Sequence, residues 1–363
     1  MRKRFLRLII AFIVLTGGSA SYVLVGAHLY QRYHLAYANY RFAPTGSCGA
    51  QIAWSPPTLV YSGLYTNQNE LVNIRFRSPS PQTLRITVGV PRFTLDQTLQ
   101  VQAAPGFQSV AFKPPLADAS VLDTLLSTGD QHADIHLRVT NGSGTVCDTT
   151  APVELKSRQW MLWQDATHGT NAPLLAGWVT PQAPAVAELV GRASDWLQQH
   201  PASYSGTDAL RGYDAGRASS RDVRNQINAL FDTLQNVYRV HYAQDNVVYS
   251  GDQRIQLPSD ILSDSSPAGM CVETTVLLAS AVERLGMRPY LILVPGHAFL
   301  GVATGLDSTA SVEYWETSDL NGGVTGSQAN LHGDTEYAQA SQQGGITVID
   351  VQFERHQGVE PME

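Results

Sequence analysis

The chain has 363 residues, of which 43% are hydrophobic and 15% charged, and its formal net charge is −7. Because domains usually contain about 100–200 residues, this length predicts two folded units and excludes a single small domain. The sequence contains no charge block and no low-complexity tract, which excludes an intrinsically disordered chain.

The first thirty residues join a basic cluster to an apolar run. Four basic residues precede an uncharged run from Leu8 to Tyr30, namely Arg2, Lys3, Arg4 and Arg7. About 20 apolar residues cross a bilayer, and flanking basic residues stay on the cytoplasmic side. We therefore expect residues 1–30 to form a cytoplasmic stub and a single transmembrane helix in the inner membrane, with the following domains periplasmic or extracellular.

A cleaved signal peptide is the alternative interpretation of this segment. Its apolar core would be residues 8–15 and its cleavage site Gly18-Ser19-Ala20. Apolar sequence continues through Val25, which a signal peptide does not need, and this favours the anchor.

The rest of the chain is acidic. Residues 31–363 keep 20 of the 24 basic residues and all 31 acidic residues, so their net charge is −11. Such a charge argues against nucleic acid as a partner.

Three cysteines in an exported chain predict one disulfide and one free thiol. Cys48 and Cys147 lie at the two ends of a β-like stretch, whereas Cys271 lies far from both. We expect a Cys48–Cys147 disulfide and a free, reactive Cys271. The alternative for Cys271 is a buried structural thiol.

Residues 48–155 are expected to form an antiparallel β-sandwich of the immunoglobulin-like sort. Apolar and polar residues alternate in short runs, most clearly at 72–76, 84–88, 109–112 and 133–139, with turn residues between them. The runs contain no catalytic cluster, so we interpret this domain as a spacer or binding module.

A change of pattern follows the predicted sandwich. Residues 156–183, with Trp160, Trp163 and Trp178, are expected to form a connector. Apolar residues then recur at helical spacing in residues 187–197 and 223–237, which predicts two helices.

Cys271 is predicted to lie in the first turn of a further helix. Residues 272–285 have strong helical character, and Gly286 can end the helix as a C-cap. The unpaired N–H groups and the dipole at a helix N-terminus favour an anion, so the thiolate should be stabilised there. The same N–H groups can hold the oxyanion of a tetrahedral intermediate.

Three strands are predicted after this helix, at residues 288–294, 297–303 and 311–317. If the last two pair with His297 opposite Glu316, residues 305–308 form the turn between them. Facing residues project from the same side of a sheet, so the Glu316 carboxylate would orient the His297 ring. Glu313 would point to the opposite face, although a pairing centred on Gly305 would bring Glu313 to His297 instead.

Four segments contain these residues and the polar residues near them, namely residues 253–262, 269–274, 294–302 and 315–317. Together they resemble a bacterial, membrane-anchored branch of the transglutaminase-like superfamily. The resemblance implies an α+β fold with a transglutaminase-like (papain-like) domain at residues 184–363, preceded by the immunoglobulin-like β-sandwich and one N-terminal transmembrane helix.

The resemblance also implies a role for each polar side chain. Cys271 is the nucleophile, His297 the base and Glu316 the orienting acid, where the superfamily more often has aspartate. Gln253 is the candidate oxyanion donor, and an ordinary glutamine at a hairpin edge is the alternative.

The function hypothesis combines these expectations. A membrane-anchored thiol hydrolase or acyltransferase would act on amide or peptide bonds of a protein, peptide or cell-wall peptide through a Cys-His-Glu triad. No metal or organic cofactor is implied. The alternative is a catalytically inactive binding or assembly subunit that uses the same domain as a scaffold.

Overall fold

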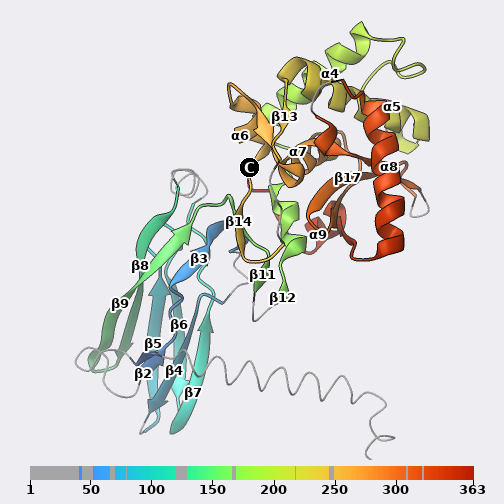
Figure 1. The fold of residues 1–363 in the computed structure, drawn as a ribbon. Helices are drawn as coiled ribbons and strands as arrows, with labels where there is room; N and C mark the ends of the chain where they lie inside the picture. Colours follow the sequence, from blue (N-terminus) through green and yellow to red (C-terminus); the bar gives the residue numbers. More distant parts are fainter. Residues whose placement is uncertain are drawn as a thin grey trace, which may run out of the picture. The chain divides into compact units, whose positions relative to one another are not determined.

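The computed structural model describes residues 41–42, 52–65, 70–78, 80–118, 129–165, 169–216, 218–244, 249–307, 310–320 and 323–363 (Figure 1). Two sequence-based predictions fall on other positions. The anchor at residues 1–30 and Cys48, the expected partner of Cys147, both lie outside the described residues.

The fold predicted from the sequence is corrected in one element, the transmembrane helix. None of the helices in the described ranges is both long enough and apolar enough to span a membrane. Among them, α8 (Gly326–Gln343) has 18 residues but is rich in Gln, Gly and Ser. The more apolar α7 (Cys271–Arg284) has 14 residues, short of the roughly 20 that a bilayer needs. The described chain is therefore α+β without that helix.

The chain divides into two compact units. The first consists of the residues before Tyr61 and those from Tyr65 to Leu155, and the second of Tyr61–Leu64 and Lys156–Glu363. Each unit has its own buried apolar cluster.

The first unit is a β-sandwich built from the strands that alternation predicts. Within the described residues, one sheet has the order β1-β2-β4-β7 and the other β3-β9-β8-β5-β6 (Figure 1). The pairs within the first sheet and those from β9 to β6 are antiparallel. Their bounds are β1 (Arg41–Phe42), β2 (Ile52–Trp54), β3 (Leu59–Tyr61), β4 (Val72–Ser78), β5 (Gln82–Gly89), β6 (Gln97–Ala103), β7 (Gly106–Phe112), β8 (Gln131–Asn141) and β9 (Gly144–Lys156).

Alternation along each strand gives the sandwich its core. In β8, for example, Ile135, Leu137 and Val139 are fully buried, whereas Asp134 and Arg138 are exposed. The buried residues of both sheets form one cluster, as period-two burial requires.

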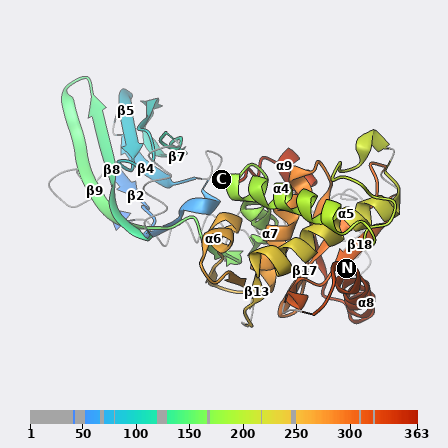
Figure 2. The ribbon, with the colours of Figure 1, turned by 90° about the horizontal axis from the view of Figure 1, so that it is seen from above.

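The second unit is built around an antiparallel sheet with a helix on each face. Its described strands lie in the order β18-β17-β16-β19. Leu291, Leu293 and Leu300 pack in one cluster with α7, whereas Ile292 and Phe299 pack on the other face with α8 (Figure 2). The strand bounds are β16 (Pro289–Val294), β17 (His297–Ala303), β18 (Val312–Trp315) and β19 (Thr347–Asp350).

Further elements complete this unit. Helices α4 (Pro184–Gln199) and α5 (Ser220–Thr233) are the two that helical spacing predicts, and the structure also contains α6 (Pro258–Ser263) and α9 (Val351–His356). Strand pairs are formed by β10 (Trp160–Leu162) with β14 (Asp252–Arg254), β11 (Gln164–Asp165) with β12 (Gly169–Thr170), and, in parallel, β13 (His241–Tyr242) with β15 (Ala268–Gly269). Short helical turns lie at η1 (Ser62–Leu64), η2 (Ala172–Trp178), η3 (Asp214–Gly216), η4 (Leu234–Tyr238) and η5 (Thr317–Asp319).

The segment expected to be a connector contributes to the core of the second unit. Residues 156–183 supply β10, β11, β12 and η2, and Trp163 and Trp178 are almost fully buried in the cluster that also contains Cys271.

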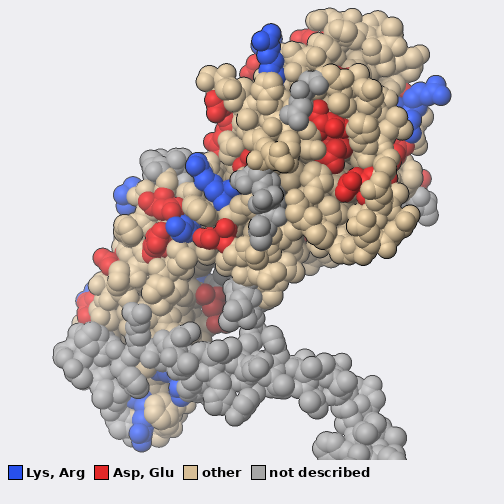
Figure 3. All heavy atoms as spheres, viewed as in Figure 1, with Lys and Arg blue, Asp and Glu red and all other residues tan. Residues whose placement is uncertain are grey.

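The two units differ in charge. Residues 156–363 contain 23 acidic and 12 basic residues, a net charge of −11, whereas residues 31–155 contain eight of each. Figure 3 shows acidic side chains in several places on the visible face of the second unit, with basic side chains in fewer.

Candidate active site

Cys271 is the first residue of α7, and its side chain is fully buried. Its thiol is free. The helix runs to Arg284, and Gly286 follows it with a φ of 73°, a left-handed conformation that glycine adopts without strain. The predicted helix, its end and the place of the thiol in its first turn are therefore confirmed.

The turn before Cys271 is held by a buried carboxylate. Glu273 accepts hydrogen bonds from the backbone N–H of Met270 (2.9 Å) and of Gln256 (2.8 Å), and from the Gln256 side chain (3.1 Å). Burial raises the pKa of Glu273, while these hydrogen bonds lower it. Glu273 thereby ties the segment after β14 to the N-terminus of α7.

His297 is the first residue of β17. Pro295-Gly296 connects β16 to β17, with Gly296 at a φ of 76°, and Val294 pairs with His297. Proline followed by glycine at positive φ is the sequence of a type II turn. This tight turn fixes the position of His297 at the start of β17.

The His297 imidazole lies between the thiol and a carboxylate. Its Nε2–H donates to Glu316 Oε2 at 2.8 Å, and the Cys271 side chain lies close enough to the ring to influence its pKa. Burial lowers the pKa of His297, but the hydrogen bonds and charges of Cys271 and Glu316 outweigh burial and raise this pKa to about 10. The protonated ring can donate from one nitrogen to each neighbour.

Glu316 is fixed through both carboxylate oxygens. While Oε2 accepts from His297, Oε1 accepts from the Ser318 backbone N–H at 2.9 Å. The backbone N–H of Glu316 donates to Ala329 of α8 at 2.9 Å. Glu316 is buried, so water competes little for these bonds.

Glu313, the alternative acid, is bound elsewhere. The Arg224 guanidinium on α5 donates to its two carboxylate oxygens at 2.6 and 2.7 Å. The predicted contact between His297 and Glu316 is present, and Glu313 does not replace Glu316.

The strand register differs from the predicted one by two residues. Leu300 faces Trp315 and Val302 faces Glu313, so continuing the ladder would place Glu316 opposite Phe299 rather than His297. The reason is that β18 ends at Trp315, and Glu316 turns away to cap η5. Glu316 therefore reaches His297 diagonally, over a distance that its long side chain can span.

Gln253 lies on β14, next to the N-terminus of α7. Trp163 Nε1–H donates to Gln253 Oε1 at 2.9 Å, and Gln253 Nε2 lies 3.1 Å from the Met270 sulfur. An indole N–H only donates, so it fixes which end of the amide is the oxygen. The amide N–H₂ is thus directed toward the residue that precedes Cys271, as a donor to an oxyanion would be.

Tyr249 is a site residue that no pattern in the sequence predicts. Its hydroxyl donates to the backbone carbonyl of His297, and its ring packs edge-on against Trp163, with 4.8 Å between ring centroids. Burial and the nearby Cys271 raise the pKa of Tyr249 well above its ordinary value, so it remains a donor. No periodicity or motif around residue 249 signals this contact, which joins residues 48 apart.

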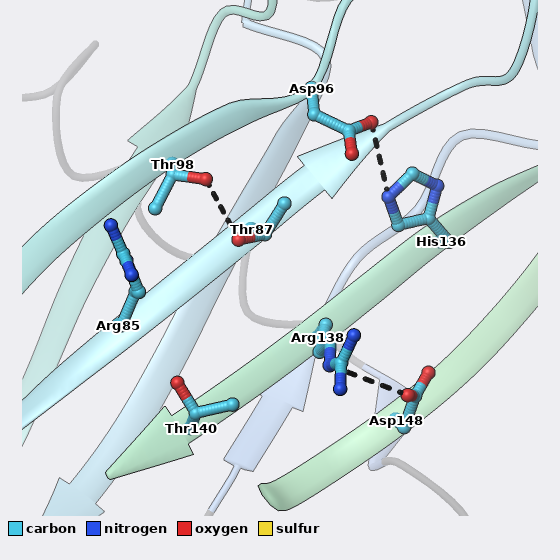
Figure 4. Close-up of a pocket in the computed structure, with 8 residues that line it drawn as sticks. All are labelled: Arg85, Thr87, Asp96, Thr98, His136, Arg138, Thr140 and Asp148. Carbon is cyan, nitrogen blue, oxygen red and sulfur yellow. Dashed lines mark hydrogen bonds and ion pairs between the residues drawn. The ribbon is translucent and has the colours of Figure 1, made fainter. Parts of the chain in front are cut away.

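A separate concavity of about 550 Å³ lies on the five-stranded sheet of the first unit (Figure 4). Its lining residues are Arg85, Thr87, Asp96, Thr98, His136, Arg138, Thr140 and Asp148. Several of them pair with each other: His136 with Asp96 (3.2 Å), Arg138 with Asp148 (3.7 Å) and Thr87 with Thr98 (2.9 Å). These contacts are typical of the solvent-facing side of a sheet, and neither a cysteine nor a serine is among the lining residues.

The structure therefore brings Cys271, His297 and Glu316 together and places Gln253 beside them. No protein-family model matches the chain, and no curated protein sequence is significantly similar to it.

Proposed function

We propose that the protein is a thiol-dependent acyl-transfer enzyme of the transglutaminase-like kind, which acts on amide or peptide bonds. The observation that carries the proposal is the His297 imidazole, held between the Cys271 thiol and the Glu316 carboxylate. A nucleophile, a base and a group that orients the base are the parts this chemistry needs.

In the proposed reaction the Cys271 sulfur attacks the carbonyl carbon of an amide. The sulfur–carbon bond forms and the carbon–nitrogen bond breaks, while the His297 imidazolium, which carries the proton of the thiol, gives it to the leaving amine. Water or a second amine then attacks the thioester, with His297 accepting its proton, and releases the product and the thiol. Glu316 stabilises the imidazolium, and the Gln253 amide donates to the oxyanion.

The charge of the second unit favours basic over acidic substrates. Its net charge of −11 attracts cationic groups at long range, and this attraction weakens with salt. A protein or peptide that presents lysine side chains fits this charge, either near the scissile amide or as the attacking amine.

One observation favours the second candidate, a binding or assembly subunit without turnover. The Cys271 side chain has no exposed surface, whereas a nucleophile must meet its substrate. A scaffold would need no such access.

Alkylation of the purified chain by a small thiol-reactive amide, followed by intact mass at about pH 7, separates the two candidates. The enzyme requires rapid addition of one probe, abolished in Cys271→Ala and slowed at least about tenfold in His297→Ala. Glu316→Gln should slow the reaction. Glu313→Gln is a matched control that weakens a partly exposed ion pair outside the site, and it should react like the wild type. An inert Cys271, or equal rates in the wild type and His297→Ala, would support the scaffold.

A further inference from the structure

Three buried threonine hydroxyls join the segment that carries Glu316 to the helix that carries Cys271. Thr317 Oγ1 lies 3.1 Å from Thr274 Oγ1 and 2.9 Å from Thr275 Oγ1. It also lies 3.4 Å from the backbone carbonyl of Cys271 itself. Thr274 and Thr275 belong to α7, whereas Thr317 is the first residue of η5.

The place of Thr317 in the chain links this network to the site. Thr317 directly follows Glu316, whose carboxylate binds His297. A shift of Thr317 relative to α7 would therefore move the carboxylate relative to the thiol. Thr274 Oγ1 also reaches the Cys271 carbonyl, at 3.1 Å, so two hydroxyls converge on the backbone of the nucleophile.

Packing alone does not require these hydroxyls. Thr274, Thr275 and Thr317 are almost fully buried, where valine would fill the same volume without burying a polar group. Hydrogen bonds in a buried network are directional and fix one arrangement of the two elements, which dispersion contacts do less strictly. The hydroxyl network therefore fixes the position of the Thr317 segment relative to α7.

We propose that Thr317 is a positioning residue that holds Glu316 in line with His297 and Cys271 through its hydroxyl bonds to the first turn of α7. The inference rests on the proposed function, because it assigns Thr317 a part in the same triad. The titratable groups that face the His297 ring and its backbone are the Cys271 thiol of α7, the Glu316 carboxylate before η5 and the Tyr249 hydroxyl.

The test is the titration of the His297 ring, followed by NMR of protein labelled in its histidine rings, with His297→Gln identifying the signal. In the wild type the ring should stay protonated to a pH of about 10. In Thr317→Val we expect its pKa to fall by about one unit or more toward 6.5, because the carboxylate is no longer held in line. Thr317→Ser keeps the hydroxyl and should restore the wild-type titration.

Thr233→Val is the matched control. Thr233 is also fully buried in the second unit, and its hydroxyl donates to a backbone carbonyl of α5, that of Ala229, at 2.7 Å. This variant should lose stability without changing the His297 titration. If Thr317→Val does not fold, Thr275→Val removes the partner hydroxyl from the helix side and should lower the same pKa.

The outcomes separate the inference from the proposed function. If Thr317→Val folds and its His297 titrates as in the wild type, the positioning role is overturned and the triad stays intact. If Thr317→Val does not fold, a wild-type His297 titration in Thr275→Val has the same meaning. An inert Cys271 in the alkylation experiment would overturn the proposed function itself, and with it the inference that rests on it.

Discussion

His297 lies beside groups from different parts of the chain. Glu316 binds its ring, the Cys271 side chain influences the pKa of the ring, and the Tyr249 hydroxyl donates to its backbone carbonyl. Because the ring is mostly buried, these bonds face little competition from water. The free energy of unfolding should therefore depend on whether the His297 ring is protonated.

The pH dependence of stability should reveal this link. The folded-state pKa of about 10 lies above the ordinary value of 6.5, so the folded protein binds the His297 proton more tightly than the unfolded chain does. The resulting stabilisation is fully present below pH 6.5 and is lost as pH rises through about 10. Urea denaturation should find Glu316→Gln less stable than the wild type by about 1–2 kcal/mol near neutral pH, with the difference shrinking toward pH 10. A difference that grows with pH would contradict the assignment of the proton to His297.

Local patterns predict some residues of the site and cannot predict others. Cys271 at a helix N-terminus and His297 after Pro295-Gly296 follow from short-range signals that are visible in the sequence. Tyr249 and Thr317 act through contacts with residues far along the chain, and neither lies in a periodic pattern or capping motif that indicates such a partner. Their roles became visible only once the fold brought the partners together.

At the scale of elements, α8 packs closely against β18 because small residues face the strand. A Cβ at Gly333 would lie 2.6 Å from the Trp315 backbone nitrogen and from the Tyr314 carbonyl carbon. The Asn330 side chain also donates to the Tyr314 carbonyl, at 2.9 Å. This close approach positions β18, and with it the start of the segment that contains Glu316.

Gly333→Ala should therefore push α8 away from the strand. We expect a loss of about 1–3 kcal/mol in the free energy of unfolding. The added methyl group would clash with backbone atoms, which cannot move aside as the end of a flexible side chain can. Gly191→Ala in α4 is the control, since a Cβ there meets nothing within 4 Å and should stabilise the helix by about 0.4–1 kcal/mol. Thermal and urea denaturation measure both, and equal effects of the two substitutions would refute the close approach.

The helices and strands differ in how well the sequence predicts them. Strands β4, β5, β7 and β8 follow from alternation, and α4, α5 and α7 from helical spacing. In contrast, α8 shows no strong apolar stripe, because the residues it buries are Gly326, Ala329, Asn330, Gly333 and Ala340. A helix that packs through small residues leaves little periodic signal.

The strand register shows why a wrong pairing can still place a site correctly. The predicted pairing of β17 with β18 was wrong by two residues, and a shift of two keeps every side chain on its own face of the sheet. Sequence could not fix the register, because it did not show that Glu316 leaves the strand to cap η5.

At the scale of the whole molecule, each unit depends on its own apolar cluster. In the first unit Cys147 is fully buried among the residues of the sandwich core. Its predicted partner, Cys48, lies outside the described residues. The pairing stays a prediction.

A Cys48–Cys147 disulfide would close a loop of about a hundred residues and stabilise the sandwich by roughly 2–5 kcal/mol. Peptide mapping without reduction should recover the two cysteines in one cross-linked peptide, and Cys271→Ala should leave this peptide unchanged. Reduction should lower the melting temperature of the oxidised protein. A map in which Cys147 carries a free thiol, or is joined to Cys271, would exclude the bond.

The contacts that assemble the site also have consequences for the order of folding. The His297–Glu316 bond joins residues 19 apart, and the contact between Thr317 and Cys271 joins residues 46 apart. The bond from Arg158 to the Met362 carbonyl instead closes a loop of 204 residues. Loop-closure entropy rises with loop length, so the short loops of the site close at the smaller entropic cost. We expect the thiol, the imidazole and the acid to meet in a partly folded chain whose last residues have not yet docked.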